Sequence, residues 1–162
     1  MKTKSEIITV GLKDEEVTSW EGFKTIPHLT IEEVNPDEVD LFVIPGGEPD
    51  KLFNEPKLLQ LINSLYNKNK VMGAICSAPI HFAKAGILNG HKYTTTLPIK
   101  EFDSFNNNEF LNQNVVEDGN LITATAAGYV DFALAIGQKM NIFADKADYE
   151  ETVNYFKYFN QK

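Results

Sequence analysis

The chain has 162 residues, enough for one domain whose core folds without disulfides or structural metals. With 43% hydrophobic and 23% charged residues, its composition is that of a globular protein and excludes a disordered one. The net charge of −8 repels phosphate groups and no basic patch offsets it, so nucleic acids and anionic membrane surfaces are excluded as partners.

One cysteine and three scattered histidines limit the chemistry further. Cys76 cannot form an internal disulfide, and His28, His81 and His91 lack the close spacing of metal ligands, so we expect no metal. A single free cysteine suits the reducing cytoplasm, where we place the protein. The apolar runs are too short to cross a bilayer, and Met1 to Glu6 is not followed by the apolar core of a signal peptide.

The first part of the chain predicts short strands. Ile7 to Val10 is β-branched and is followed by Gly11, which is typical of a short strand. Glu16 to Pro27 alternates unevenly between apolar and polar residues and predicts two short exposed strands or a hairpin. Thr30 and Glu33 have the spacing of a capping box, which predicts one or two helical turns, ended by Pro36.

The middle of the chain alternates between strand and helix patterns. Asp40 to Pro45 is a continuous apolar run before Gly46 and Gly47, typical of a strand buried on both faces. A helix is predicted from Pro56 through Leu65, a second buried strand over 70–75, and a helix over 77–85.

The last part continues the alternation. We predict a strand over 93–96, a short helix over 98–105, a hairpin over 115–123 that turns at Asp118-Gly119, and helices over 130–142 and 148–159. The pattern predicts an α/β fold with a doubly wound, mostly parallel sheet, helices on both faces and a small β-hairpin, in one domain spanning residues 1–162.

Aromatic and acidic residues late in the chain have structural interpretations. We expect Trp20, Phe23 and the aromatic residues between Tyr149 and Phe159 to pack in the core or on a dimer surface. Asp131 starts the helix over 130–142. It interacts there with the helix N-terminus or lines a pocket, and we favour the first role.

The candidate site is the turn at Cys76, between a buried strand and a helix with Pro79 in its first turn. Unpaired N–H groups and the helix dipole at such a turn stabilise a thiolate, and the sharp turn presents the side chain as in a nucleophile elbow. The N–H of Ser77 and a backbone N–H at Gly46-Gly47 can bind an oxygen above the sulfur. The alternative is that Cys76 is a small buried hydrophobic residue.

Several motifs resemble the ThiJ/PfpI family, a branch of the class I glutamine amidotransferase-like superfamily with a flavodoxin-like fold. They are Asp40-Leu-Phe-Val-Ile-Pro-Gly-Gly47, Gly73-Ala-Ile-Cys-Ser-Ala-Pro79, Leu88-Asn-Gly-His-Lys-Tyr-Thr-Thr95 and the segments 118–124 and 131–136. The resemblance runs from about Ile7 to Met140. It implies that Cys76 is nucleophilic or oxidation-sensitive, that the N–H groups of Gly47 and Ser77 form the oxyanion hole, that no organic cofactor is needed, and that the protein forms a homodimer or larger assembly.

Two departures from the family bear on activity. In the family, the chain opens with a central strand and a helix, and a Glu at their junction forms a hydrogen bond with the cysteine. This chain resembles the family only from its second strand onward, so the matching Glu is absent. Glu15 and Glu16 lie after that strand and do not replace the family's Glu. Either the start has been lost, or another element fills the gap in the middle of the sheet, because an open slot would expose unpaired backbone groups on two strands. Our hypothesis is that the natural product is longer, or that Ile7 to Val10 has moved inward or pairs across chains.

The second departure concerns the base. Where the family often places a His, this chain has Ser77 and Thr96, and a threonine cannot accept a proton at neutral pH. His81 and His91 are weaker alternatives, and Thr96, Gly46 and Asp131 are candidate pocket residues.

Two functions follow from these observations. The first is a thiol-dependent hydrolase, or a glyoxalase or deglycase, acting on small carbonyl compounds through Cys76. The second is a non-catalytic redox or stress-response protein in which Cys76 oxidises reversibly. Glutamine amidotransferase activity is less favoured, because no His-x-Glu pair occurs late in the chain.

Overall fold

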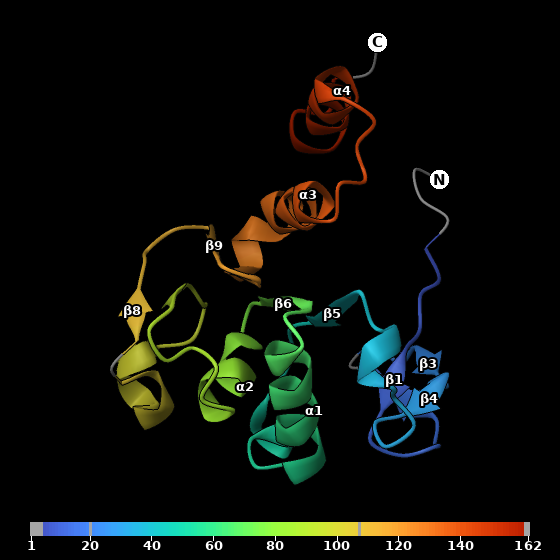
Figure 1. The fold of residues 1–162 in the computed structure, drawn as a ribbon, viewed down its shortest axis with the longest axis vertical. Coiled ribbons are helices and arrows are strands. Elements are labelled where there is room, and N and C mark those ends of the chain that lie inside the picture. Colours follow the sequence, from blue (N-terminus) through green and yellow to red (C-terminus); the bar gives the residue numbers. More distant parts are fainter. Residues whose placement is uncertain (1–4, 20, 107, 161–162) are drawn as a thin grey trace.

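The fold is built on a four-stranded sheet in the order β5-β6-β10-β9, seen in a computed structural model that describes residues 5–19, 21–106 and 108–160 (Figure 1). β5 (Leu41–Ile44), β6 (Val71–Ile75) and β10 (Leu121–Ala124) run parallel, and β9 (Val115–Asp118) pairs antiparallel with β10. The prediction of a mostly parallel α/β sheet is confirmed.

Helices cover both faces of this sheet. α1 (Pro56–Asn67) and α2 (Pro79–Lys84) lie on one side, and α3 (Tyr129–Lys139) lies on the other (Figure 1). Successive β10 residues divide between the two cores, because Leu121 packs with the α1 and α2 residues whereas Ile122 packs with Phe132 of α3. α4 (Lys146–Lys157) packs on α3, outside this layer.

Local sequence signals explain where the main elements begin and turn. α1 starts at Pro56, whose missing N–H costs nothing in a first turn, and the Glu55 side chain accepts a hydrogen bond from the Lys57 N–H. β9 and β10 form the predicted hairpin, with Asp118 opposite Leu121 and Gly119 at φ +60° in the turn.

The remaining strands form three small sheets of two strands each. β1 (Val10–Gly11) pairs in parallel with β4 (Leu29–Thr30), β2 (Val17–Thr18) pairs antiparallel with β3 (Lys24–Thr25), and β7 (Lys92–Tyr93) pairs in parallel with β8 (Glu109–Phe110). The hairpin predicted over 16–27 is thus present as β2 and β3. β1 pairs with β4 and not with β5, so within the described residues no strand pairs with the outer edge of β5.

The helix predicted after Thr30 is wrong. Glu33 Oε2 does accept hydrogen bonds from the Thr30 N–H and hydroxyl, at 2.7 and 2.8 Å, but residues 31–33 form only a turn. The capping contact forms at the end of β4, without an apolar helical run behind it. Pro36 begins the 3-10 helix η1 (Pro36–Glu38) rather than ending a helix.

The structure also corrects the elements predicted over 93–96 and 98–105. β7 ends at Tyr93, because beyond it the Thr94 N–H donates to Thr123 Oγ1 at 2.9 Å and the Thr96 N–H donates to Cys76 O at 3.0 Å in place of ladder pairing with β8. The predicted helix is two 3-10 turns, η3 (Ile99–Glu101) and η4 (Asp103–Phe105).

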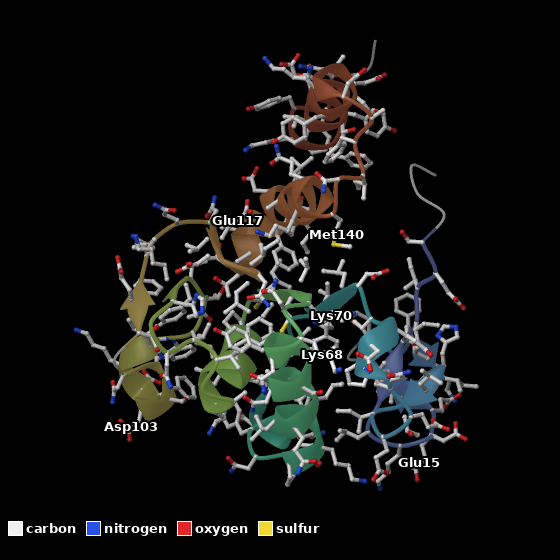
Figure 2. All side chains as sticks on the ribbon, viewed as in Figure 1. Glu15, Lys68, Lys70, Asp103, Glu117 and Met140 are labelled. Carbon is white, nitrogen blue, oxygen red and sulfur yellow. The ribbon has the colours of Figure 1, made fainter. Side chains whose placement is uncertain are left out.

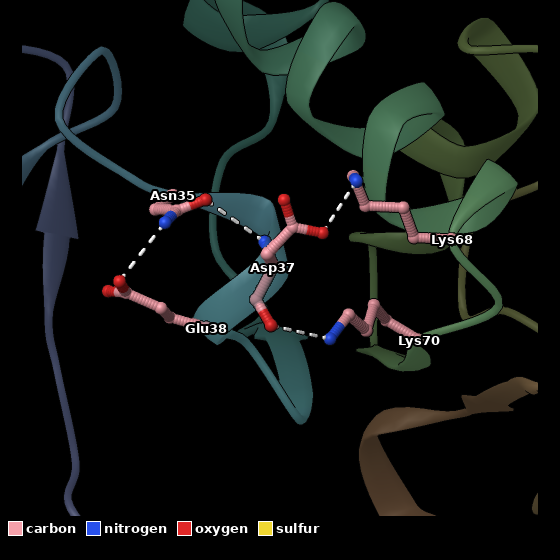
Figure 3. A network of polar contacts seen from close by, with 5 residues as sticks. All are labelled: Asn35, Asp37, Glu38, Lys68 and Lys70. Atoms are coloured by element: carbon pink, nitrogen blue, oxygen red, sulfur yellow. Dashed lines mark hydrogen bonds and ion pairs between the residues drawn. The ribbon is translucent and has the colours of Figure 1, made fainter.

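A polar network fixes the segment before β5 (Figure 3). Asp37 of η1 forms an ion pair with Lys68 at 2.6 Å, and its carbonyl oxygen accepts a hydrogen bond from Lys70. The hydrogen bond from Lys68 holds the pKa of the Asp37 carboxyl below its usual value. Because Lys68 follows α1 and Lys70 precedes β6, the contacts tie the entry of β5 to both elements.

Most of the aromatic residues predicted for the core or a dimer surface are exposed where the structure describes them. Phe23 is 73% exposed, and on and after α4 Tyr155, Phe156, Tyr158 and Phe159 are all at least 51% exposed. Trp20 lies outside the described residues. Within the described ranges no helix is both long and apolar enough to cross a bilayer.

Candidate functional site

Cys76 occupies a sharp turn directly after β6. Its φ of +65° lies in the left-handed region that non-glycine residues rarely adopt. Backbone contacts hold this conformation: the Cys76 N–H donates to Ala124 O at 2.8 Å, and Cys76 O accepts from the Thr96 N–H at 3.0 Å and the Thr95 hydroxyl at 2.8 Å. The thiol is half-buried, so it is neither sealed in the core nor fully exposed.

The helix after Cys76 begins later than predicted. α2 starts at Pro79, and Cys76, Ser77 and Ala78 form the turn before it. The left-handed backbone at Cys76 interrupts the helical path, and Pro79 takes the first helical position. Because α2 spans only 6 residues, the local N–H groups of the turn matter more to the thiol than the dipole of the helix.

Gly46 allows the end of β5 to approach Cys76 closely. A Cβ atom at Gly46 would lie 2.6 Å from Cys76 Cβ and 3.3 Å from Sγ, so any side chain there would displace the cysteine. The structure therefore brings Gly46 and Cys76 together, although they are thirty positions apart in sequence.

The two proposed oxyanion donors differ in their present contacts. The Ser77 N–H has no acceptor among the described residues. The Gly47 N–H donates to Ser77 Oγ at 3.3 Å, and the same hydroxyl donates to Gly47 O at 2.6 Å. One donor is thus free, and the other is held in a long hydrogen bond.

Thr96 and Asp131 have different positions relative to Cys76. Thr96 is exposed and contacts the cysteine through its backbone, while its hydroxyl accepts from the Ala126 N–H at 2.8 Å. Asp131 lies in the first turn of α3 and pairs with Lys157 of α4 at 2.5 Å. The ion-pair partner of Asp131 thus lies on α4, outside the Cys76 turn.

Both histidines considered as bases have other surroundings. His81 is buried beside Phe53, and burial lowers the pKa of its imidazole to about 4. His91 Nε2 lies 2.8 Å from the Tyr66 hydroxyl, and its Nδ1 lies 3.4 Å from Asp118 Oδ1.

The acidic residues near the start of the chain are also engaged elsewhere. Glu16 pairs with Lys24 across the β2–β3 hairpin at 2.8 Å, and Glu15 lies 4.0 Å from Lys13. Glu15 appears at the outer margin of the β1–β4 region in Figure 2. Across the described ranges, no three His, Cys, Asp or Glu side chains form a group that could hold a metal ion.

Sequence reasoning missed the residues that support the turn. The hydroxyls of Thr95 and Ser77 bond backbone groups of Cys76 and Gly47. The run of three threonines at 94–96 was a possible signal, since threonine hydroxyls often bond backbone groups. No local pattern identifies the contact of Ser77 with a residue thirty positions earlier.

A half-buried cysteine in a left-handed turn, at the carboxyl edge of a doubly wound sheet, defines the class of α/β proteins with a cysteine elbow. The profile of the DJ-1/PfpI family matches residues 2–139, and the chain belongs to that family. α4 lies beyond the matched residues.

Known proteins resemble the chain to different extents. The uncharacterized protein MJ0967 of Methanocaldococcus jannaschii is 40% identical over 112 residues, which are 67% of this chain and 55% of that protein. The chain thus spans about half of that relative's length. The deglycase PfpI of Pyrococcus furiosus is 30% identical over 125 residues, covering 76% of this chain and 75% of the enzyme.

A solved structure supports the fold. The DJ-1 superfamily protein Atu0886 of Agrobacterium tumefaciens superimposes with a TM-score of 0.81 at 24% identity, covering 94% of this chain and 84% of that one. The family predicted from the motifs and the predicted fold class are both confirmed.

Proposed function

We propose that the protein is a thiol-dependent enzyme of the glyoxalase or deglycase type, acting on small reactive carbonyl compounds through Cys76. The observation that carries the proposal is the half-buried thiol in its left-handed turn, with the free Ser77 N–H beside it. The relative from Pyrococcus furiosus is named a deglycase, which supports this class of chemistry.

The first step would be addition of the Cys76 thiolate to the carbonyl carbon. A C–S bond forms, the π electrons of the C=O bond move to oxygen, and a proton then neutralises that oxygen to give a hemithioacetal. The N–H of Ser77, and that of Gly47 once released from Ser77 Oγ, would stabilise the developing negative charge. Gly46 would leave room for the adduct, because it has no side chain beside the sulfur.

Methylglyoxal turnover tests the proposal. We expect wild-type protein to consume methylglyoxal and Cys76→Ser to lose the activity, because a serine hydroxyl is a far weaker nucleophile at neutral pH. Ser64→Ala, on α1, is a matched control that should keep full activity. Turnover that survives in Cys76→Ser would contradict the proposal.

A redox sensor is the second candidate. It is favoured by the surroundings of the histidines, since His81 packs beside Phe53 and His91 contacts Tyr66 and Asp118, which leaves the thiol without either as its base. For this function we expect Cys76 to form a sulfenic acid with dilute peroxide and to recover with dithiothreitol, as followed by intact mass. Recovery without any methylglyoxal turnover would select the sensor over the enzyme.

We also propose that the protein is a cytoplasmic homodimer or larger assembly. The exposed aromatic residues of α4 support association, because Tyr155 and Phe156 are 51% and 57% exposed. Light scattering coupled to size exclusion tests the assembly, and a monomer at micromolar concentration would refute it. Cell fractionation tests the location.

A further inference from the structure

We propose that Ser77 is a positioning residue: its hydroxyl holds Gly47 beside Cys76, where the Gly47 N–H can exchange this hydroxyl for the oxygen of a bound carbonyl ligand. This inference rests on the proposed function of Cys76 and deepens it. It concerns the side chain of Ser77, whereas the oxyanion role proposed above concerns only the backbone N–H of that residue.

One hydroxyl contacts both polar backbone groups of Gly47. Ser77 Oγ donates to Gly47 O at 2.6 Å and accepts from the Gly47 N–H at 3.3 Å. A hydroxyl has one proton to donate and two lone pairs, so its donor capacity is used by the carbonyl. The donated bond is short and the accepted bond is long, which makes the accepted bond the weaker of the two.

Ser77 is well placed to act as an anchor. The residue is only 5% exposed, and its carbonyl oxygen accepts a hydrogen bond from the Ile80 N–H of α2 at 3.2 Å. The preceding residue, Cys76, is bonded to β10 through Ala124 O. The hydroxyl therefore projects from a turn that two neighbouring elements hold.

The Gly46–Glu48 segment has no comparable support of its own. Gly46, Gly47 and Glu48 are exposed, and the two contacts with Ser77 are the only hydrogen bonds that this segment makes with the rest of the described chain. Gly47 also has a φ of +151°, a conformation that favours glycine. Without the Ser77 hydroxyl, only packing of Gly46 against Cys76 would locate the segment.

The asymmetry of the two bonds suggests how a ligand would use them. An oxygen that develops negative charge is a better acceptor than a neutral hydroxyl, so it can replace Ser77 Oγ at the Gly47 N–H. The short bond to Gly47 O remains in place during this exchange. Gly47 thus stays anchored through its carbonyl oxygen while its N–H changes acceptor.

Hydrogen exchange of the Gly47 amide gives a readout that does not depend on turnover. In ¹⁵N-labelled Ser77→Ala we expect this amide to exchange roughly tenfold faster than in wild type, because its acceptor is lost. Ser77→Thr keeps the hydroxyl and should restore the protection, and Ser64→Ala should change nothing. Equal exchange in wild type and Ser77→Ala would overturn the proposal.

Protection of Cys76 by methylglyoxal links the contact to the site. Methylglyoxal that adds to the thiol blocks its alkylation by iodoacetamide, and we expect Ser77→Ala to need roughly tenfold more methylglyoxal for half protection. Where turnover is measurable, kcat/KM should fall by a similar factor. Unchanged protection and kcat/KM, with faster amide exchange, would make Ser77 a structural contact only and would also overturn the proposal.

The two proposals fail in different measurements. If wild-type Cys76 neither binds nor turns over methylglyoxal, the proposed function fails, and the positioning role falls with it. If wild type binds methylglyoxal and Ser77→Ala matches it, the proposed function stands and only the role of Ser77 is refuted.

Discussion

At the scale of single residues, the backbone of Cys76 carries strain that a stability measurement can detect. A non-glycine residue in the left-handed region costs about 1–2 kcal/mol, and glycine avoids most of that cost. Because Cys76 has a φ of +65°, we expect Cys76→Gly to be more stable than Cys76→Ala by about 1 kcal/mol. Urea unfolding of both variants, monitored by circular dichroism, measures the difference.

Ala78 provides the control for this comparison. It lies two positions later with right-handed angles, φ −60° and ψ −27°, where glycine has no steric advantage. Ala78→Gly should therefore reduce stability by about 0.5–1 kcal/mol. If Cys76→Gly were less stable than Cys76→Ala, the left-handed turn described for Cys76 would be wrong.

His81 predicts a dependence of stability on pH. Burial lowers its pKa from 6.5 to about 4, so between these values the unfolded chain binds a proton that the folded chain does not. Above pH 6.5, His81 is neutral in both the folded and the unfolded chain and does not lower the free energy of unfolding. As the pH drops from 6.5 to 4, the free energy of unfolding should fall by on the order of 1–3 kcal/mol.

Replacement of His81 should remove this part of the pH dependence. We expect urea unfolding of His81→Leu to show a flatter profile between pH 6.5 and 4 than wild type. Ser64→Ala on α1, which leaves every titratable side chain in place, serves as the control and should follow the wild-type profile. A wild-type slope that persists in His81→Leu would assign the effect to other groups.

The position of Cys76 was predictable at this scale, whereas its supporting contacts were not. A buried strand followed by Cys76 and Pro79 is a local pattern, and local patterns are readable in sequence. The contact of Ser77 with Gly47 depends on β5 and β6 pairing in register. The rotamer of a serine thirty residues from its partner has no sequence signal.

At the scale of elements, the contact of β6 with α3 depends on Gly73. A Cβ atom at this position would lie 2.8 Å from Phe132 Cζ and 3.2 Å from Ile136 Cδ1. We expect Gly73→Ala to destabilise the fold by about 1–3 kcal/mol, because the close packing of α3 on the sheet leaves no room for a methyl group. Thermal unfolding measures the loss.

A second substitution identifies the cause. Phe132→Leu shortens the side chain that the new methyl group would meet, so the double variant should lose less stability than the sum of the two single variants. Additive losses would mean that Gly73 is needed for another reason, such as its backbone freedom.

The predictability of the elements followed their length and packing. α1 was predicted closely because Leu58, Leu61, Ile62 and Leu65 recur at helical spacing and are all buried. The segments after Thr30 and Tyr93 were misassigned because side-chain hydroxyls and Glu33 bond the backbone there in place of regular structure. Such short segments lack the periodicity on which prediction depends.

At the scale of the whole molecule, the division into separate sheets determines which strand edges remain free. β1 pairs with β4, and within the described residues β5 forms the end of the central sheet (Figure 1). β5 has the sequence Leu-Phe-Val-Ile, which is typical of a central strand and lacks the charges that usually protect an edge. Ile7 to Val10 has not moved inward beside β5, because β1 pairs with β4. Coverage of the β5 edge by additional chain or by a second copy stays a hypothesis.

The unprotected edge predicts self-association through β5. Val43 is 39% exposed, so a lysine there places a charge on the edge strand with limited loss of buried surface. We expect Val43→Lys to weaken any dimer formed through this edge by at least about tenfold in Kd, measured by sedimentation velocity. Val17→Lys adds the same charge to the β2–β3 hairpin, where Val17 is 56% exposed, and should leave association unchanged. If the two variants behave alike, the β5 edge is not the site of association. The exposed aromatic side chains of α4, which lie away from the sheet edge, would then be substituted next.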